Sequence, residues 1–167
     1  MAATYEKMAT TTASGSSTNV TFTSISGAYT DLVLIISNVT SQIDNVGIRL
    51  NSDTGTNYSR TILSANGTAV AGNRGSNDSY LYTMYKDTAG GNPVMAIMQF
   101  QNYSNSTTYK NVLVRQQTDS SGTKGTLAMV GLWRATPAAI TNISITSLNA
   151  NFNSGSIFTI YGILKAA

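Results

Sequence analysis

The side chains that most often carry out enzyme chemistry are scarce in this sequence. It contains no His and no Cys, which excludes Ser-His-Asp and Cys-His catalysis, disulfides and the usual zinc and copper sites. Glu6 is the only Glu. Acid–base chemistry is therefore left to six Asp residues, which are Asp31, Asp44, Asp53, Asp78, Asp87 and Asp119.

These Asp residues mostly occupy positions typical of turns. In a turn, an Asp carboxylate accepts hydrogen bonds from nearby backbone amides. A glycosidase would instead need two carboxylates that face each other across a cleft. Residues from distant turns could still meet in space, but turn formation is the favoured interpretation. We therefore expect no catalytic residues, no cofactor and a protein that is not an enzyme.

Two kinds of segment partly match ligand-binding loops. The segment 51–55 (Asn-Ser-Asp-Thr-Gly) has the pattern of half a calcium loop, but Ile62 stands where the closing carboxylate is needed. A turn without metal is the expectation here, and a bound cation is the alternative. The glycine-rich segments 72–75 and 90–91 match no phosphate-binding pattern. They predict hairpins or loops whose glycines need a positive φ.

Tyrosines are the best candidates for a binding role, because the chain has nine of them and one Trp. An exposed Tyr can anchor a protein interface or stack on a sugar ring. The competing interpretation is packing in the core or between neighbouring strands, which is also what we expect of Trp133. The tyrosines near expected strand ends and loops are Tyr58, Tyr80, Tyr82, Tyr85, Tyr103 and Tyr109.

Charge argues against nucleic-acid and membrane partners. Charged residues make up only 10% of the 167 residues, and the net charge is +3. The arginines at 49, 60, 74, 115 and 134 are dispersed along the chain, whereas phosphate binding needs several basic groups on one face. The longest apolar run, 32–36, is far too short to span a bilayer. Ser, Thr, Asn and Gly are abundant instead, which suits exposed sheet faces and tight turns.

The elements that must position these residues are strands. Residues 18–24 alternate apolar and polar side chains, as a half-buried strand does, and 29–39 is apolar on both faces at its centre. Turn signals recur at short intervals, and no segment carries a sustained helical stripe. The further expected strands are 44–50, 58–64, 79–85, 94–102, 108–116, 125–134, 142–148 and 157–164.

This pattern predicts an all-β, antiparallel, jelly-roll-like β-sandwich of roughly eight to ten strands in a single domain. Residues 18–167 form the sandwich. Residues 1–17 are small and polar around Tyr5 and Met8, and we expect an N-terminal arm or an edge strand there. Exposed edges favour aggregation, so a chain with so few charges is expected to cover its edges by assembling into a homo-oligomer.

Six segments of the sequence have a distinctive pattern, and they are 5–12 (Tyr-Glu-Lys-Met-Ala-Thr-Thr-Thr), 29–34, 49–59, 102–110, 131–134 (Gly-Leu-Trp-Arg) and 155–163. These segments resemble a family of small virion proteins from marine and freshwater tailed bacteriophages. The resemblance runs through nearly the whole chain in the same order. It implies a jelly-roll-like fold and a structural role in the particle, and it brings no catalytic residues with it.

The role expected from this resemblance is that of a capsid decoration or cement protein on the outer surface of the head. Such a subunit would bind the major capsid protein as a trimer and stabilise the assembled shell. We expect Tyr5, Lys7 and Met8 of the arm to contact the shell. Contacts with other subunits or partners are expected from Tyr80, Tyr82, Tyr85, Tyr103 and Tyr109.

The alternative is a module of a tail fibre or spike that binds a host receptor or glycan through its tyrosines. Jelly rolls are common lectin scaffolds, so the fold class does not decide between the two roles.

Overall fold

The computed structural model describes residues 4–39, 45–85, 93–120 and 123–164, and these contain twelve strands and no helix that could cross a membrane. The strands are β1 (Tyr5–Thr12), β2 (Asn19–Phe22), β3 (Asp31–Val39), β4 (Asn45–Leu50), β5 (Tyr58–Ala65), β6 (Val70–Asp78), β7 (Leu81–Tyr85), β8 (Val94–Phe100), β9 (Lys110–Ser120), β10 (Thr123–Trp133), β11 (Ile143–Ser147) and β12 (Ile157–Ile163).

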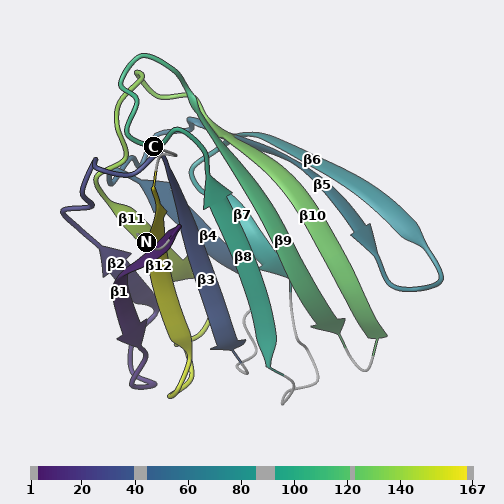
Figure 1. Cartoon of the computed structure of the whole chain (residues 1–167). Coiled ribbons are helices and arrows are strands. Elements are labelled where there is room, and N and C mark those ends of the chain that lie inside the picture. Colours follow the sequence, from purple (N-terminus) through teal and green to yellow (C-terminus); the bar gives the residue numbers. More distant parts are fainter. Residues whose placement is uncertain (1–3, 40–44, 86–92, 121–122, 165–167) are drawn as a thin grey trace.

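The strands form two antiparallel sheets packed face to face (Figure 1). The larger sheet has eight strands in the order β1-β12-β3-β8-β9-β10-β5-β6, and the smaller has four in the order β2-β11-β4-β7. The prediction of an all-β, antiparallel sandwich is confirmed. The strand number exceeds the expected eight to ten because β1 and β6 are strands as well.

Eight of the strands trace a jelly roll. Along β1, β2, β3, β4, β7, β8, β11 and β12 the chain passes from one sheet to the other at every step except from β4 to β7, which are neighbours in the smaller sheet. They lie in the order β1-β12-β3-β8 in one sheet and β2-β11-β4-β7 in the other. Two hairpins, β5–β6 and β9–β10, are inserted into this path and join the larger sheet beyond β8. Figure 1 shows this extension sweeping away from the two-layered part.

The core lies between the sheets and is built by strand alternation. Leu32, Leu34 and Ile36 of β3 are fully buried on the side that faces the smaller sheet, where Ile48 and Ile145 meet them. Burying an aliphatic side chain of this size stabilises the fold by about 1.5–3 kcal/mol. The wide apolar interior explains how a chain with few ion pairs holds together.

One segment expected to be a turn is a strand instead. Residues 72–75 lie within β6, which pairs with β5 from Tyr58↔Asp78 to Ala65↔Val70. Neither glycine of this segment has a positive φ. The real turn is at Asn66–Gly67, where Gly67 has φ 89° and the Asn66 side chain accepts hydrogen bonds from two backbone amides. The other expected glycine loop, 90–91, lies outside the described residues.

The N-terminal segment takes the edge-strand form of the two that were expected. β1 pairs with β12 from Tyr5↔Ile163 to Thr12↔Ile157 and forms one edge of the larger sheet. Both ends of the described chain therefore lie at the same end of this strand pair, and β6 forms the opposite edge of the sheet. Deleting 2–17 would remove part of the sandwich and not only an appendage.

Candidate functional site: a groove across the eight-stranded sheet

The outer face of the larger sheet carries rows of side chains that cross several strands. Thr61, Val130, Leu113 and Gln99 are register partners on successive strands, and Arg74 of β6 continues the row at the free edge. A second row runs Leu63, Ala128, Arg115 and Ile97. Alternation along each strand puts these residues on the face that points away from the core.

Three adjoining hollows lie along these rows, with volumes of about 440, 390 and 370 Å³. The first and second share Thr61 and Val130, and the second and third share Arg115. Together they form a groove that crosses from β6 to β8. Four strand spacings of about 4.8 Å make it about 19 Å long.

The groove has an aliphatic floor. Val130 and Leu63 are 52% and 57% exposed, which is high for large apolar side chains on a sheet face. Leu113, Met95 and Ile97 extend the floor toward β8. The residues that line the three hollows, as far as the structure describes them, include no aromatic side chain. An exposed apolar surface of this kind is typical of an interaction site.

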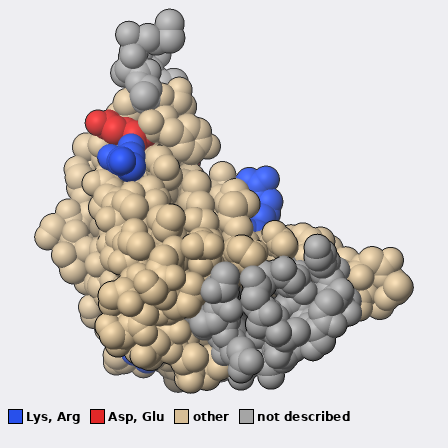
Figure 2. Space-filling model, turned by 90° about the horizontal axis from the view of Figure 1, so that it is seen from below, with Lys and Arg blue, Asp and Glu red and all other residues tan. Residues whose placement is uncertain are grey.

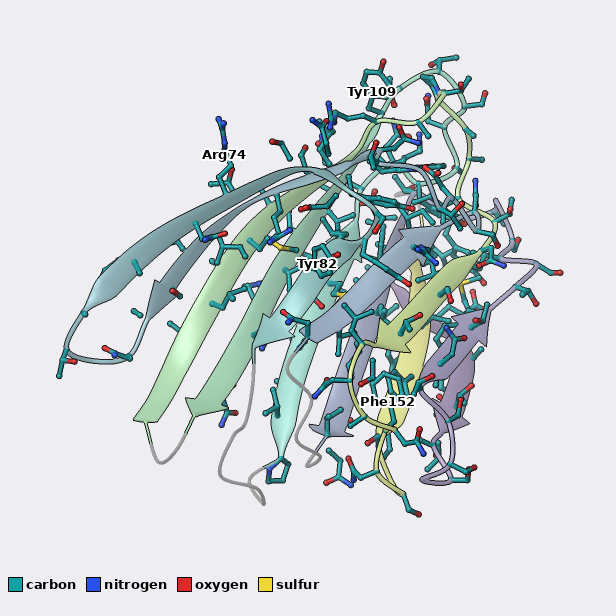
Figure 3. The ribbon with its side chains drawn as sticks, turned by 180° about the vertical axis from the view of Figure 1, so that it is seen from behind. Arg74, Tyr82, Tyr109 and Phe152 are labelled. Carbon is teal, nitrogen blue, oxygen red and sulfur yellow. The ribbon has the colours of Figure 1, made fainter. Side chains whose placement is uncertain are left out.

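The charged side chains among the described residues of the groove lining are all arginines, and these residues include no Asp, Glu or Lys. Arg74 stands at one end and points away from the body of the molecule (Figure 3), and Arg115 lies at the junction of two hollows. Neither has a hydrogen-bond or ion-pair partner among the described residues. Arg134 donates to Asn77 Oδ1 at 2.9 Å. Elsewhere charged side chains are sparse, as Figure 2 shows for the face seen from below.

The smaller sheet has an outer face of different chemistry. Tyr80 and Tyr82 have ring centroids 5.8 Å apart, and the Arg49 guanidinium lies 3.7 Å from the Tyr80 ring centroid. Tyr80 lies flat over Gly47, where an added Cβ would come within 2.5 Å of the ring. Arg60, paired with Asp78, lies over the Tyr82 ring.

Hydroxyl and amide side chains cover the rest of this smaller-sheet face. The Asn19 side-chain amide donates to Ser144 Oγ at 2.9 Å and to Thr146 Oγ1 at 2.7 Å. Thr21 donates to Asn19 Oδ1 at 2.6 Å. This part of the face is therefore polar and uncharged, and the Tyr80 and Tyr82 rings with the Arg49 guanidinium lie beside it.

The tyrosines predicted to contact partners fall into three groups. Tyr109 is exposed, and Tyr80 and Tyr82 are half-buried on the smaller sheet. Tyr103 is fully buried, so its prediction as a surface contact is wrong. Its hydroxyl donates to the Ser26 carbonyl, which ties two loops together, and burial raises its pKa. The Tyr85 side chain lies outside the described residues.

The three residues expected to contact a shell lie on β1. Tyr5 and Lys7 are exposed, whereas Met8 is half-buried and packs against the core. Tyr5 and Lys7 are thus accessible to a partner, but at the edge of the sheet opposite to β6.

The segment that resembles a calcium loop is a hydrogen-bonded turn. Asp53 accepts from Gly55 N at 2.8 Å, Asn57 Nδ2 at 2.9 Å and Trp133 Nε1 at 2.6 Å. Burial alone would raise the Asp53 pKa, but these hydrogen bonds and the positive charge of Arg49 outweigh it and lower the pKa. The carboxylate is thus used by the fold, and the described residues include no cluster of three metal-binding side chains.

The groove escaped sequence analysis because its residues come from five strands that span residues 58–133 of the chain. Arg74 and Arg115 lie in one groove only because the strand order places β10 and β5 between β9 and β6. The signal that the sequence offered was the type of side chain at the outward-facing positions of each strand. Leu63, Leu113 and Val130 are apolar at positions where a solvated face would carry polar side chains.

Neither a protein-family model nor a curated protein matches the sequence. Among solved structures, the chain is similar to the galectin LEC-6 of Caenorhabditis elegans, with 10% identity, a TM-score of 0.37, and coverage of 93% of this chain and 96% of that one. It is also similar to the CBM2 module of an evolved Dit from Lactobacillus casei BL23 phage J-1, with 8% identity, a TM-score of 0.19, and coverage of 89% and 70%. Both TM-scores are low, so the functions of these proteins are not transferred to this chain.

Proposed function

We propose that this chain is a non-catalytic structural subunit of a tailed bacteriophage particle, which binds the major capsid protein on the outer surface of the head and stabilises the assembled shell. The observation that carries the proposal is the groove across β6, β5, β10, β9 and β8. Its described lining has an aliphatic floor with Arg and Met and without Lys, Asp or Glu, which matches the composition of the buried centre of protein–protein interfaces. The sequence resemblance to small virion proteins is the reason for proposing a phage particle as the assembly to which this groove attaches.

The mechanism follows from mass action. A subunit that binds the assembled shell and not its separate parts stabilises assembly by its binding free energy, multiplied over many copies. A trimeric arrangement is part of the proposal, because linked subunits gain avidity on a repetitive surface. The accessible edge residues Tyr5 and Lys7 are proposed as additional shell contacts.

The test is imaging of the purified particle that carries this chain. Density on the head at local threefold positions, in hundreds of copies, is the expected result. The groove should face the shell. Density confined to the tail in a few copies would overturn the head assignment.

A matched pair of variants links the groove to attachment. Val130→Gln places a polar group on the floor, whereas Ile157→Gln makes a similar change at a 37% exposed position on the same sheet outside the groove. Val130→Gln should lower occupancy on heads, and Ile157→Gln should not. Equal occupancy of the two variants would show that attachment uses another surface.

A second function, glycan binding by a fibre or spike module, is favoured by the smaller sheet. The Tyr80 and Tyr82 rings beside Arg49 and a neutral hydroxyl-rich face offer both stacking and hydrogen bonds to a sugar. A glycan array followed by calorimetry tests it. Binding that is lost in Tyr80→Ala but kept in Val130→Gln would assign the glycan role to this face.

A further inference from the structure

We infer that the groove takes a segment of a protein partner in which two carboxylates flank an aliphatic side chain. This inference deepens the proposed attachment role and rests on it for the partner being a protein. It follows from three properties of the groove: its positive charge, the aliphatic side chains of its floor and the distance between its arginines.

The positive charge of the groove predicts a partner segment with negative charge. Arg74, Arg115 and Arg134 are the exposed cations among the described lining residues of the groove, and no carboxylate among these residues neutralises them. Arg74 and Arg115 have no partner within the described part of the chain, so their guanidinium donors are available. A guanidinium pairs with a carboxylate through two parallel hydrogen bonds, which gives such pairs direction as well as strength.

The aliphatic floor of the groove favours a protein partner over other anionic ligands such as nucleic acids or acidic sugars. Nucleic acids and sugars are commonly held by aromatic side chains, on which bases and sugar rings stack. The described part of the groove lining has no aromatic side chain and presents Leu63, Leu113, Val130 and Ile97 instead. An aliphatic side chain of a protein partner fits this surface best, because it removes apolar area from water on both sides.

The distance between the arginines determines how far apart the carboxylates of the partner segment must be. Arg115 and Arg74 are separated by three strand intervals and offset by two residues along the strands, so their Cα atoms lie about 16 Å apart on an ideal sheet. An extended segment advances about 3.3 Å per residue, so two side chains four residues apart start about 13 Å from each other, and the length of the side chains covers the remainder. Carboxylates four residues apart, with a leucine midway on the same side, would reach both arginines and rest the leucine near Val130.

The test uses the acetylated, amidated peptide Thr-Glu-Thr-Leu-Thr-Glu-Thr, titrated into the isotopically labelled full chain at low salt and followed by NMR. Two control peptides replace both Glu by Gln or the Leu by Ser. Shifts should concentrate on β5, β6, β9 and β10, and each control peptide should bind about fivefold more weakly or worse. Single-stranded oligothymidylate and a uronic-acid oligosaccharide are titrated in parallel.

Two arginine variants make the test specific. Arg74→Gln and Arg115→Gln should each lower the affinity for the peptide by about fivefold. Arg49→Gln, on the other sheet, should leave this affinity unchanged. Equal affinity of the Glu and Gln peptides, shifts confined to the smaller sheet, or tighter binding of the nucleotide or uronate would each overturn the inference. If the peptide binds as expected but the chain is absent from heads, the inference stands and the head assignment fails.

Discussion

Replacing Asp53 by Ala should destabilise the protein more than any other single change in its loops. The carboxylate receives hydrogen bonds from Trp133 Nε1 at 2.6 Å, Gly55 N at 2.8 Å and Asn57 Nδ2 at 2.9 Å. It thereby joins the turn after β4 to the end of β10, which are remote in sequence. Ala removes the acceptor from all three donors at once.

The magnitude follows from what is left unsatisfied. Trp133 is 5% exposed, so its indole N–H has no water to replace the carboxylate, and an orphaned buried donor costs about 1–3 kcal/mol. The Gly55 and Asn57 donors are partly exposed and recover some hydrogen bonding from water. The expected loss in the free energy of unfolding is about 3 kcal/mol, which lowers Tm by about 6–12 °C for a domain of this size.

The assay is urea unfolding followed by fluorescence, because Trp133 is the only Trp and reports on this contact directly. A cycle with Trp133→Phe isolates the pair. Once the indole N–H is gone, Asp53→Ala no longer orphans it, so the double variant should be more stable than the sum of the single losses by about 1–2 kcal/mol.

The pH dependence gives an independent check. The Asp53 pKa is lowered in the folded state, so its contribution is present at neutral pH and is lost as the pH falls through that pKa. Asp53→Asn should therefore flatten the acid limb of the stability curve. If Asp53→Ala stays within about 0.5 kcal/mol of the parent with the same urea dependence, the reasoning about this turn is refuted.

Three further changes test the core. Burial raises the pKa of Tyr58 to about 12, so its contribution to stability is lost as the pH rises from about 10 toward 12, and Tyr58→Phe should remove that alkaline loss in urea titrations. Gly131→Ala places a Cβ against the buried Leu81 side chain, too close for both to fit, and should cost about 1–3 kcal/mol in thermal unfolding. Gly72→Ala meets only the Ile62 carbonyl, at an ordinary contact distance of 3.9 Å, and should be nearly neutral, so equal effects of the two changes would contradict the packing. Tyr103→Phe removes a buried hydroxyl donor and should cost about 1–2 kcal/mol; a silent change would contradict that role.

The strands that sequence analysis found are those whose side chains alternate or whose centre is apolar throughout. The expected strand 29–39 contains β3, and 18–24 contains β2, because burial on one or both faces imposes a pattern that the sequence must carry. β6 was missed for the opposite reason. It is an edge strand with mostly exposed, small side chains, so its glycines indicated a turn while its pairing with β5 is set by the Asn66–Gly67 hairpin.

Side-chain roles were less predictable than strands. Tyr103 lies in a segment rich in Asn and Ser that indicates an exposed loop, yet the loop folds back so that the ring is buried and its hydroxyl serves the Ser26 carbonyl. Asp53 was correctly assigned to a turn, but its partner Trp133 is brought to it by the pairing of β5 with β10. Such contacts depend on strand order, which local patterns do not encode.

The groove is made almost entirely by the two hairpins that extend the jelly roll. Apart from Met95, Ile97 and Gln99 of β8, and Arg134 just after β10, its lining comes from β5, β6, β9 and β10. The eight jelly-roll strands are already divided between two sheets, with much of the apolar core between them. Side chains on the outer face of the hairpins are therefore free of the packing constraints that act on the core face. Their aliphatic and arginine composition is not required by the fold, and the proposed attachment to a protein partner would account for it.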